Sequence, residues 1–379
     1  MTILIFVVVI VALIVVHEFG HLVAAKLSGM RVDEFGLGYP PRAMIIAKAG
    51  DTLYTLNWLP FGGFVKILGE NGAQSAGEEI RDPRAFTNRP RILQALVLVA
   101  GVAMNLLFAY VLITGALIAG TPRALSADEI QVAHNTELAV AVVLSESPAS
   151  VAGLMPGDSI LSAKSARGEW HASIGSTGLT TSVPLPKSFS AFIAEGGGAP
   201  IELTVMRGGD KRTVVATPAA GVAIADSARY ALGIEVATIG VVPLSFGEAL
   251  TDGARLTWGA TVLTAAGLGH FFLSIFTLSA DLSQVAGPVG IAGVVGSASL
   301  QGVGYLLSIM AIISINLAII NLIPIPALDG GRLLFVIIES VIRRPIKTSV
   351  ARAVNGIGFV FLILLMLVVT ANDLFRILR

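Results

Sequence analysis

The sequence contains no cysteine and few charged side chains. Without Cys in its 379 residues the chain has neither disulfide bonds nor thiolate metal ligands, and the redox compartment stays undetermined. Asp, Glu, Lys and Arg make up 13% of the residues and hydrophobic types 54%. Ordinary globular domains carry about 25% charged residues. This shortage of charge predicts a membrane protein.

The sequence also lacks a charge imbalance and a secretion signal. Its 25 basic and 25 acidic residues give a formal net charge of +0, which argues against a nucleic-acid partner. No basic segment precedes the first apolar run, and no small-residue cleavage site follows it. We therefore expect that run to stay in the mature protein rather than to be removed as a signal peptide.

Residues 1–25 are expected to form the first transmembrane helix. Residues 2–16 carry no charge, and the first lysine is Lys26. This run is long enough for a bilayer core of about 30 Å. It nevertheless contains the pentapeptide His17-Glu18-Phe19-Gly20-His21. Ionisable side chains within a span are costly, so these residues are functional candidates.

The pentapeptide has the HExxH pattern. Two histidines four residues apart lie on one face of a helix, so His17 and His21 can bind one metal ion. Glu18 lies beside them, where it can deprotonate a metal-bound water. The alternatives are a chance match, or histidines hydrogen-bonded within a helix bundle. The cost of burial in a membrane favours the metal site.

Residues 26–91 are expected to form a loop that contains a β-hairpin at 52–68. Two runs rich in β-forming residues flank Pro60-Phe61-Gly62-Gly63, and their apolar character predicts packing against helices. A second span is predicted at 92–119. Asn105 within it either forms a helix–helix hydrogen bond or faces the metal cavity.

Residues 121–240 are predicted to form a small α+β domain. The region from Ala139 to Ala163 has the pattern strand, short helix, turn, strand. A second short helix is expected from Phe189 to Ala194, and a hairpin around Gly208-Gly209-Asp210. The stretch AGLMPGDSILSA resembles bacterial PDZ domains. Since PDZ domains bind peptides by strand addition, we expect a peptide or protein to bind here.

Residues 241–303 are expected to lie at the membrane surface as a helical segment. Leu256 to Ala280 is apolar and long enough to cross a bilayer, but it is rich in glycine and hydroxyl groups. Crossing once would place the two halves of the metal site on opposite sides of the membrane. His270 is expected to be a surface or interfacial residue rather than a ligand.

A third span is predicted at 304–331, and it ends in an irregular segment. Pro324 and Pro326 cannot both lie inside a regular helix, so the helix ends near them. Asp329 follows, either as a turn residue before two glycines or as the third metal ligand. Because irregular backbone at membrane depth needs a protein or water-filled cavity, we favour the ligand. A loop at 332–353 and a fourth span at 354–371 complete the chain.

Basic residues predict the orientation in the membrane. Ten of them flank the spans at 26–91 and 332–353, and three lie on the opposite side. The ten are Lys26, Arg31, Arg84, Arg89, Arg91, Arg332, Arg343, Arg344, Lys347 and Arg352, and the three are Arg123, Arg376 and Arg379. The positive-inside rule places the first set in the cytoplasm. The termini and the PDZ-like domain are then outside, and the metal site lies toward the cytoplasmic side.

These motifs together resemble the site-2 protease family, specifically the bacterial RseP/RasP-like zinc intramembrane proteases. The matching pieces are HEFGH at 17–21, LPFGGFVKILGE at 59–70, one PDZ-like domain, GPVGI at 287–291 and NLIPIPALDGG at 321–331. They occur in the family's order across nearly the whole chain. One departure is AGVAMN at 100–105, where the family pattern has a proline.

The resemblance implies one zinc ion held by His17, His21 and Asp329, with Glu18 as the general base. It also implies that Asn321 positions the substrate and that the hairpin offers an edge to it. Further candidates for substrate or site contacts, with Asn105 above, are Phe64, Val65, Lys66 and Asn316.

The expected function is a zinc-dependent endopeptidase of the bacterial inner membrane. It would cut single-span membrane proteins in regulated intramembrane proteolysis, such as anti-sigma factors or signal-peptide remnants. A transporter is the first alternative, because charge within the membrane and a broken helix occur in transporters. A catalytically inactive PDZ scaffold is the second, although the intact motif argues against it.

Overall fold

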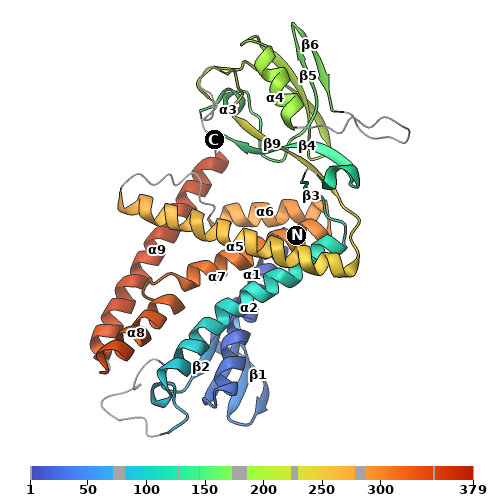
Figure 1. Cartoon of the computed structure of the whole chain (residues 1–379). Coiled ribbons are helices and arrows are strands. Elements are labelled where there is room, and N and C mark those ends of the chain that lie inside the picture. Colours follow the sequence, from blue (N-terminus) through green and yellow to red (C-terminus); the bar gives the residue numbers. More distant parts are fainter. Residues whose placement is uncertain are drawn as a thin grey trace. The chain divides into compact units, whose positions relative to one another are not determined.

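The computed structural model describes residues 2–70, 82–126, 128–144, 146–172, 186–222, 229–277, 287–344 and 346–378. The chain forms two compact units. The helical unit comprises Met1–Ala119 with Phe246–Arg379, and the β unit comprises Gly120–Ser245. The β unit is therefore inserted between the second and third long helices of the helical unit (Figure 1).

Long apolar helices dominate the helical unit. Their bounds are α1 (Thr2–Leu27), α2 (Arg91–Ile118), α5 (Phe246–Phe276), α6 (Pro288–Gln301), α7 (Val303–Leu322), α8 (Asp329–Ile342) and α9 (Thr348–Leu378), with a 3₁₀ turn at Phe86–Asn88. Prolines mark several boundaries: Pro90 precedes α2, Pro288 opens α6, and Pro324 follows the end of α7. These are the positions that proline favours, because it lacks a backbone N–H.

Among the described residues, five helices are long and apolar enough to cross a membrane. They are Thr2–Leu27, Arg91–Ile118, Phe246–Ser274, Val303–Leu322 and Ser349–Phe375. Four of these overlap the predicted spans, although the helix of the third ends at Leu322 rather than at residue 331. The fifth, within α5, is the segment that the sequence analysis assigned to the membrane surface. Its assignment stays a prediction. His270 on α5 is exposed, as expected for a residue that is not a ligand.

The hairpin prediction was wrong in its boundaries. Strand β1 (Val32–Ala49) pairs with β2 (Thr52–Ile67), and the turn between them lies at Gly50-Asp51 rather than at Pro60–Gly63. Residues 34–37 of β1 pair with 66–63 of β2 and also with 53–56. The two runs flanking Pro60 therefore lie on opposite sides of β1 and do not pair with each other. Gly62, with φ +88°, allows the bend between them.

One end of this sheet packs against helices, as expected, and the other is exposed. Val32, Phe35 and Ile67 lie in one buried cluster with Leu22, Ala25, Val97, Leu98 and Val336 of α1, α2 and α8. Beyond Tyr39 the side chains are exposed although many are apolar. The exposed apolar side chains are Tyr39, Met44, Ile45, Ile46, Leu56, Trp58 and Leu59. The sheet thus has one end in the core and one apolar, unpartnered end.

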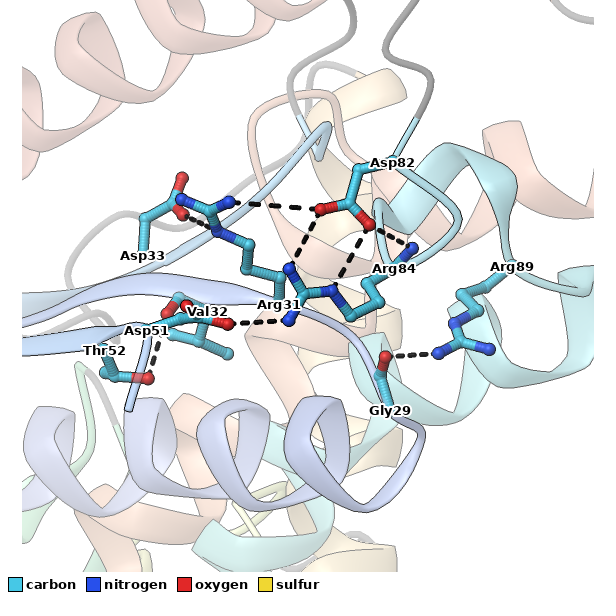
Figure 2. Close-up of polar contacts among 9 residues, drawn as sticks. All are labelled: Gly29, Arg31, Val32, Asp33, Asp51, Thr52, Asp82, Arg84 and Arg89. Atoms are coloured by element: carbon cyan, nitrogen blue, oxygen red, sulfur yellow. Dashed lines mark hydrogen bonds and ion pairs between the residues drawn. The ribbon is translucent and has the colours of Figure 1, made fainter. Parts of the chain in front are cut away.

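Ion pairs fasten the sheet to the segment that leads into α2 (Figure 2). Arg84 contacts Asp51 at the β1–β2 turn at 2.7 Å and Asp82 at 3.2 Å. Arg31, just before β1, contacts Asp33 at 2.8 Å and Asp82 at 4.0 Å. Arg89 donates to the carbonyl of Gly29 at the end of α1. Most of the basic residues in this segment therefore have partners within the protein.

The β unit is an α+β domain, as predicted. Its strands are β3 (Arg123–Ala124), β4 (His134–Val143), β5 (Ser159–Ser165), β6 (Gly168–His171), β7 (Ile201–Arg207), β8 (Asp210–Ala216) and β9 (Ile234–Val241), ordered β3-β9-β4-β5-β7-β8 with β6 beside β5. Two helices, α3 (Pro148–Val151) and α4 (Pro186–Glu195), and a 3₁₀ turn (Glu129–Gln131) complete it. Phe189 and Ile193 of α4 pack into the core of the sheet. The predicted hairpin at Gly208-Gly209 is confirmed.

Candidate metal centre

The two histidines of the HExxH motif point toward α2 from adjacent turns of α1. Both are buried, with 6% of His17 and 8% of His21 exposed. Helix α2 approaches them closely because its residue 101 is glycine. A Cβ atom added at Gly101 would lie 2.7 Å from Cε1 of both imidazoles. Gly20, on the same face of α1, meets the backbone of Ala100 in the same way. Glycine at positions 20 and 101 thus lets α1 and α2 pack closely beside the two histidines.

The third candidate ligand comes from a tight turn after α7. Helix α7 ends at Leu322, and α8 begins with Asp329 itself. Between them the backbone is extended at Ile323 and left-handed at Ala327. Gly330 and Gly331 pack directly on the carbonyl groups of 322, 323 and 325, where any side chain would clash. This turn directs the Asp329 carboxylate toward α1, and the turn-residue alternative for Asp329 is not needed.

The three side chains converge on one point. His17 Nε2 lies 2.9 Å from Asp329 Oδ2, His21 Nε2 lies 3.2 Å from the same oxygen, and the two Nε2 atoms are 3.1 Å apart. The candidate ligand atoms all lie within 4.8 Å of one another. Ligand bonds of about 2.0–2.2 Å in a tetrahedral zinc site place neighbouring ligand atoms a little over 3 Å apart. Two nitrogens and one carboxylate oxygen in this arrangement therefore fit zinc.

Hydrogen bonds at the other ring nitrogens support metal binding at Nε2. His21 Nδ1 lies 2.8 Å from the carbonyl oxygen of Val97, which can only accept. The proton is therefore on Nδ1, and the Nε2 lone pair is available. His17 Nδ1 lies 3.1 Å from the amide of Asn105, which is fully buried. This contact is a helix–helix hydrogen bond between α2 and α1 and also places Asn105 beside a candidate ligand, so both alternatives for Asn105 agree with the structure.

Glu18 lies between the ligands and the sheet. It interacts electrostatically with His21 and Asp329 and accepts a hydrogen bond from the backbone N–H of Val65. A Cβ atom at Gly63 would lie 3.6 Å from its Cγ. In the described part of the chain, residues 63–67 pair only with β1. Their unpaired edge therefore faces the predicted catalytic base.

The other predicted residues lie around this centre at different distances from it. Val65 is half-buried next to Glu18. Phe64 is half-buried with its ring stacked on Tyr39, and Lys66 is exposed. Asn316 donates to the carbonyl of Ile312 in its own helix, so no contact links it to the ligands. Asn321 is half-buried in the last turn of α7 and, among the described residues, has no recorded hydrogen bond to the ligand set.

The sequence analysis missed one partly buried ion pair beside the site. Arg332 in the first turn of α8 lies 2.5 Å from Glu70, which follows β2. Burial raises the pKa of Glu70, and the Arg332 guanidinium opposes that shift. This pair joins the sheet to the helix that carries Asp329. Its only signal in the sequence is an isolated acidic residue at the end of an apolar motif, and 262 residues separate the partners.

Comparisons with known proteins agree with this chemistry. Residues 5–365 match the model of peptidase family M50. A protein of Clostridium perfringens named "putative zinc metalloprotease" is 34% identical over 96% of this chain and 95% of its own length. A protein of a Nostoc species with the same description is 33% identical over 96% of this chain and 93% of its own length. The zinc metalloprotease RasP of Geobacillus kaustophilus is 28% identical over 97% of this chain and 96% of its own length. The transporter and inactive-scaffold alternatives are therefore rejected. The chain belongs to peptidase family M50, and it is a zinc metalloendopeptidase of the site-2 protease type.

Proposed function

We propose that this enzyme cuts transmembrane segments of single-span membrane proteins. The observation that carries the proposal is the position of the ligand set. His17 and His21 lie within one candidate span and pack against a second, and Asp329 follows a third. The ligand set therefore lies among apolar helices, where a membrane-spanning substrate would enter. Regulated intramembrane proteolysis, as of an anti-sigma factor or a signal-peptide remnant, has this requirement.

His17, His21 and Asp329 would hold the zinc ion, and Asn105 would position His17. Bound there, zinc would polarise the scissile carbonyl and lower the pKa of the attacking water toward about 7. Glu18 would accept a proton from the attacking water and return it to the nitrogen of the leaving amine. For His17 to bind through Nε2 its Nδ1 must carry a proton, so Asn105 must offer its oxygen. The Asn105 oxygen has no partner in the present amide orientation, and a half-turn of the amide satisfies both groups.

The edge of residues 63–67 is proposed to hold the substrate in an extended conformation. A helical substrate hides its carbonyl groups in intrahelical hydrogen bonds, which must open before hydrolysis. Strand addition at Phe64, Val65 and Lys66 would replace them. The exposed apolar end of the sheet, with Ile45, Ile46 and Trp58, supports contact with the bilayer. Asn321, next to the Pro324 turn, is proposed to position the substrate from the opposite side.

The β unit is proposed to select substrates outside the cytoplasm through PDZ-like peptide binding. It has its own hydrophobic core and contributes no residue to the ligand set. Together with the basic residues counted above, this supports a multi-pass protein of the bacterial cytoplasmic membrane with its active site toward the cytoplasm.

Paired measurements of metal content and cleavage test the proposal. His17→Ala, His21→Ala and Asp329→Ala should each lose zinc, because each removes one of three protein ligands. Glu18→Gln should keep one zinc per chain and lose cleavage of a reconstituted single-span substrate. A Glu18→Gln enzyme that still cleaves would refute the role of Glu18. Wild-type enzyme that cuts soluble unfolded peptides but no membrane-spanning substrate would refute the substrate class.

Proline and alanine scanning test the substrate edge. Val65→Pro removes a backbone N–H that also donates to Glu18, so cleavage of a short unstructured peptide must be measured beside that of a helical transmembrane substrate. Turnover of the helical substrate should fall much more than that of the peptide, whereas Val65→Ala should have a small effect on both. Equal effects of the two substitutions, with zinc retained in both, would contradict strand addition.

A further inference from the structure

A hollow lined by arginines lies at the end of the helical unit where α2 begins and α8 ends. Its volume is about 250 Å³, and its lining residues are Arg91, Glu339, Ser340, Arg343 and Arg344. Drug-sized ligand pockets are larger, at roughly 300–1,000 Å³. Three guanidinium groups and one carboxylate leave a clear excess of positive charge in a small space. No residue of the hollow belongs to the metal centre or to the substrate edge.

The single carboxylate in the hollow is already occupied. Glu339 Oε2 lies 2.7 Å from the Arg91 guanidinium, and Glu339 Oε1 accepts from the backbone N–H of Ile346 at 2.9 Å. No other carboxylate among the described residues pairs with Arg343 or Arg344. This contrasts with Arg31, Arg84 and Arg332, each of which contacts a carboxylate. Two exposed guanidinium groups are thus available beside a third that is held in place.

Arg343 occupies a backbone position at which its side chain is a disadvantage. It is the C-cap of α8, with φ +56° in the left-handed region. Helices usually place glycine in a left-handed conformation at their C-terminal end, because other residues are strained there by roughly 1 kcal/mol. Glycine would avoid this strain, whereas the charge of arginine gains only about 0.3–1 kcal/mol from the helix dipole at an exposed C-terminus. This points to a use for its side chain.

Apolar residues next to these arginines are exposed. Ile92 follows Arg91 and is 75% exposed, and Val341 and Ile342 precede Arg343 with 77% and 59% exposed. A ligand suited to this surface has an anionic head and an apolar tail. Guanidinium groups bind phosphate through paired hydrogen bonds, and basic pockets beside transmembrane helices bind phospholipid headgroups.

We propose that Arg91, Arg343 and Arg344 bind the phosphate of an anionic phospholipid headgroup. The acyl chains lie along Ile92, Val341 and Ile342. The headgroup joins the start of α2 to the end of α8, the helix that begins with Asp329. Anionic lipid thereby stabilises the helix that carries the third zinc ligand. The inference uses the membrane location of the chain and is independent of its proteolytic activity.

Lipid titration of the purified full chain tests the proposal. The chain is held in neutral detergent micelles, short-chain phosphatidylglycerol or phosphatidylcholine is added, and the thermal unfolding midpoint is followed. A ligand that binds the folded state raises this midpoint with concentration. Wild type should bind phosphatidylglycerol at least tenfold more tightly than phosphatidylcholine. Arg343→Gly with Arg344→Gln should remove most of this preference, since each arginine near a membrane contributes about a fivefold factor.

Three further comparisons make the result decisive. Lys347→Gln with Arg352→Gln removes the same charge from exposed residues outside the hollow, and should change the preference less than twofold. Arg343→Lys with Arg344→Lys keeps the charge but loses the guanidinium fork, and should show an intermediate preference. Equal losses in the two charge-removing variants would mean diffuse attraction and would overturn the proposal. Inorganic phosphate that raises the midpoint as much as the lipid would overturn the assignment to a lipid.

Because Arg343→Gly relieves backbone strain, a folding defect does not explain a loss of preference in that variant. The unfolding midpoint without added lipid should be equal to or above that of the wild type. Lower stability of Arg343→Gly alone in neutral detergent would show that the side chain serves the helix end, and would also overturn the proposal.

Discussion

Replacing Gly101 by alanine should separate the packing of α1 and α2 from the chemistry of the metal ligands. The added methyl carbon would lie 2.7 Å from Cε1 of His17 and of His21, whereas ordinary contacts begin near 3.4 Å. The same carbon would lie closer still to Nε2 of His21, the candidate ligand atom. The His17 imidazole would have to move by about 0.7 Å and the His21 imidazole by more, or the two helices would have to separate. Metal–ligand distances tolerate about 0.2 Å, and functional sites tolerate about 0.5 Å.

The expected cost is a loss of zinc affinity with little loss of helix stability. Repositioning of ligand side chains typically costs 10–100-fold in metal affinity. Alanine favours a helix over glycine by about 1 kcal/mol, so α2 itself should not be weakened. Competition with a chromogenic chelator measures the affinity in purified enzyme. A decrease of about 10-fold or more is expected for Gly101→Ala.

Gly115→Ala is the matched control in the same helix. Its methyl carbon would meet only Leu307 Cδ1 at 3.5 Å, an ordinary contact. This variant should bind zinc as the wild type does. If Gly101→Ala also keeps wild-type affinity, the close approach of the two helices does not position the ligands, and the packing argument fails.

Two other predictions concern buried polar groups. Asn105→Leu should lower zinc affinity roughly 10–100-fold. Asn105→Asp keeps an acceptor oxygen for His17 Nδ1 and should lose less zinc affinity. Equal losses of affinity in the two variants, measured by chelator competition, would refute the positioning role of Asn105. In the β unit, burial would raise the pKa of Asp158, but hydrogen bonds from Arg207 at 2.6 Å and from the N–H of Met155 lower it below its ordinary value. Its contribution to stability is therefore complete above the unfolded pKa of about 3.9 and is lost as pH falls through the lower folded value. Arg207→Met should destabilise the β unit by about 3–5 kcal/mol. The loss should appear as faster amide hydrogen exchange in β5 and β7 of the full chain at neutral pH. Unchanged exchange would show that the Asp158–Arg207 pair contributes little to the stability of the β unit.

The three candidate metal ligands were predictable because their signals are local. His17 and His21 are four residues apart on a helix, and the cost of burying them in an apolar run singled them out. Asp329 stood out because two prolines and two glycines surround it within eight residues. Each of these patterns depends on backbone chemistry that a short stretch of sequence contains.

The sheet and the supporting contacts were not predictable in the same way. Residues 34–37 pair with two separate segments of β2, and nothing in the local pattern selects this arrangement over a simple hairpin. Residues 32–49 were expected to belong to the loop, yet they form β1, with Pro40 and Pro41 between the paired segments that end at Tyr39 and resume at Arg42. Glu70 and Arg332 are 262 residues apart in the sequence, and they come into contact only because α8 packs beside the end of β2 in the folded chain. Such pairings are tertiary and have no period in the sequence.

The last prediction is that the chain from Phe246 to Gln301 crosses the membrane an even number of times, with zero favoured. His17 and Asp329 meet, so α7 runs in the same direction as α1. The start of α1, the end of α2 and the end of α9 then lie on one side of the membrane.

Near its start, α5 packs Gly253 against Thr114 close to the end of α2. Helix α6 packs Gly296 against Thr2, and Asp373 of α9 accepts from the N–H of Gly290 at 2.8 Å. The start of α5 and helix α6 are therefore both held at the end of the helical unit where α1 begins, which the basic residues predict to be the outer side. Cysteines introduced singly at Ser299 of α6 and at Ser283 should react with an impermeant thiol reagent in intact cells. Ser283 lies outside the described residues. No other thiol interferes, because the chain has no cysteine. A cysteine at exposed Ser349, in the cytoplasmic segment, should react only after permeabilisation. Labelling of Ser283→Cys or Ser299→Cys from the cytoplasmic side alone would show that α5 crosses and that the four-span topology is wrong.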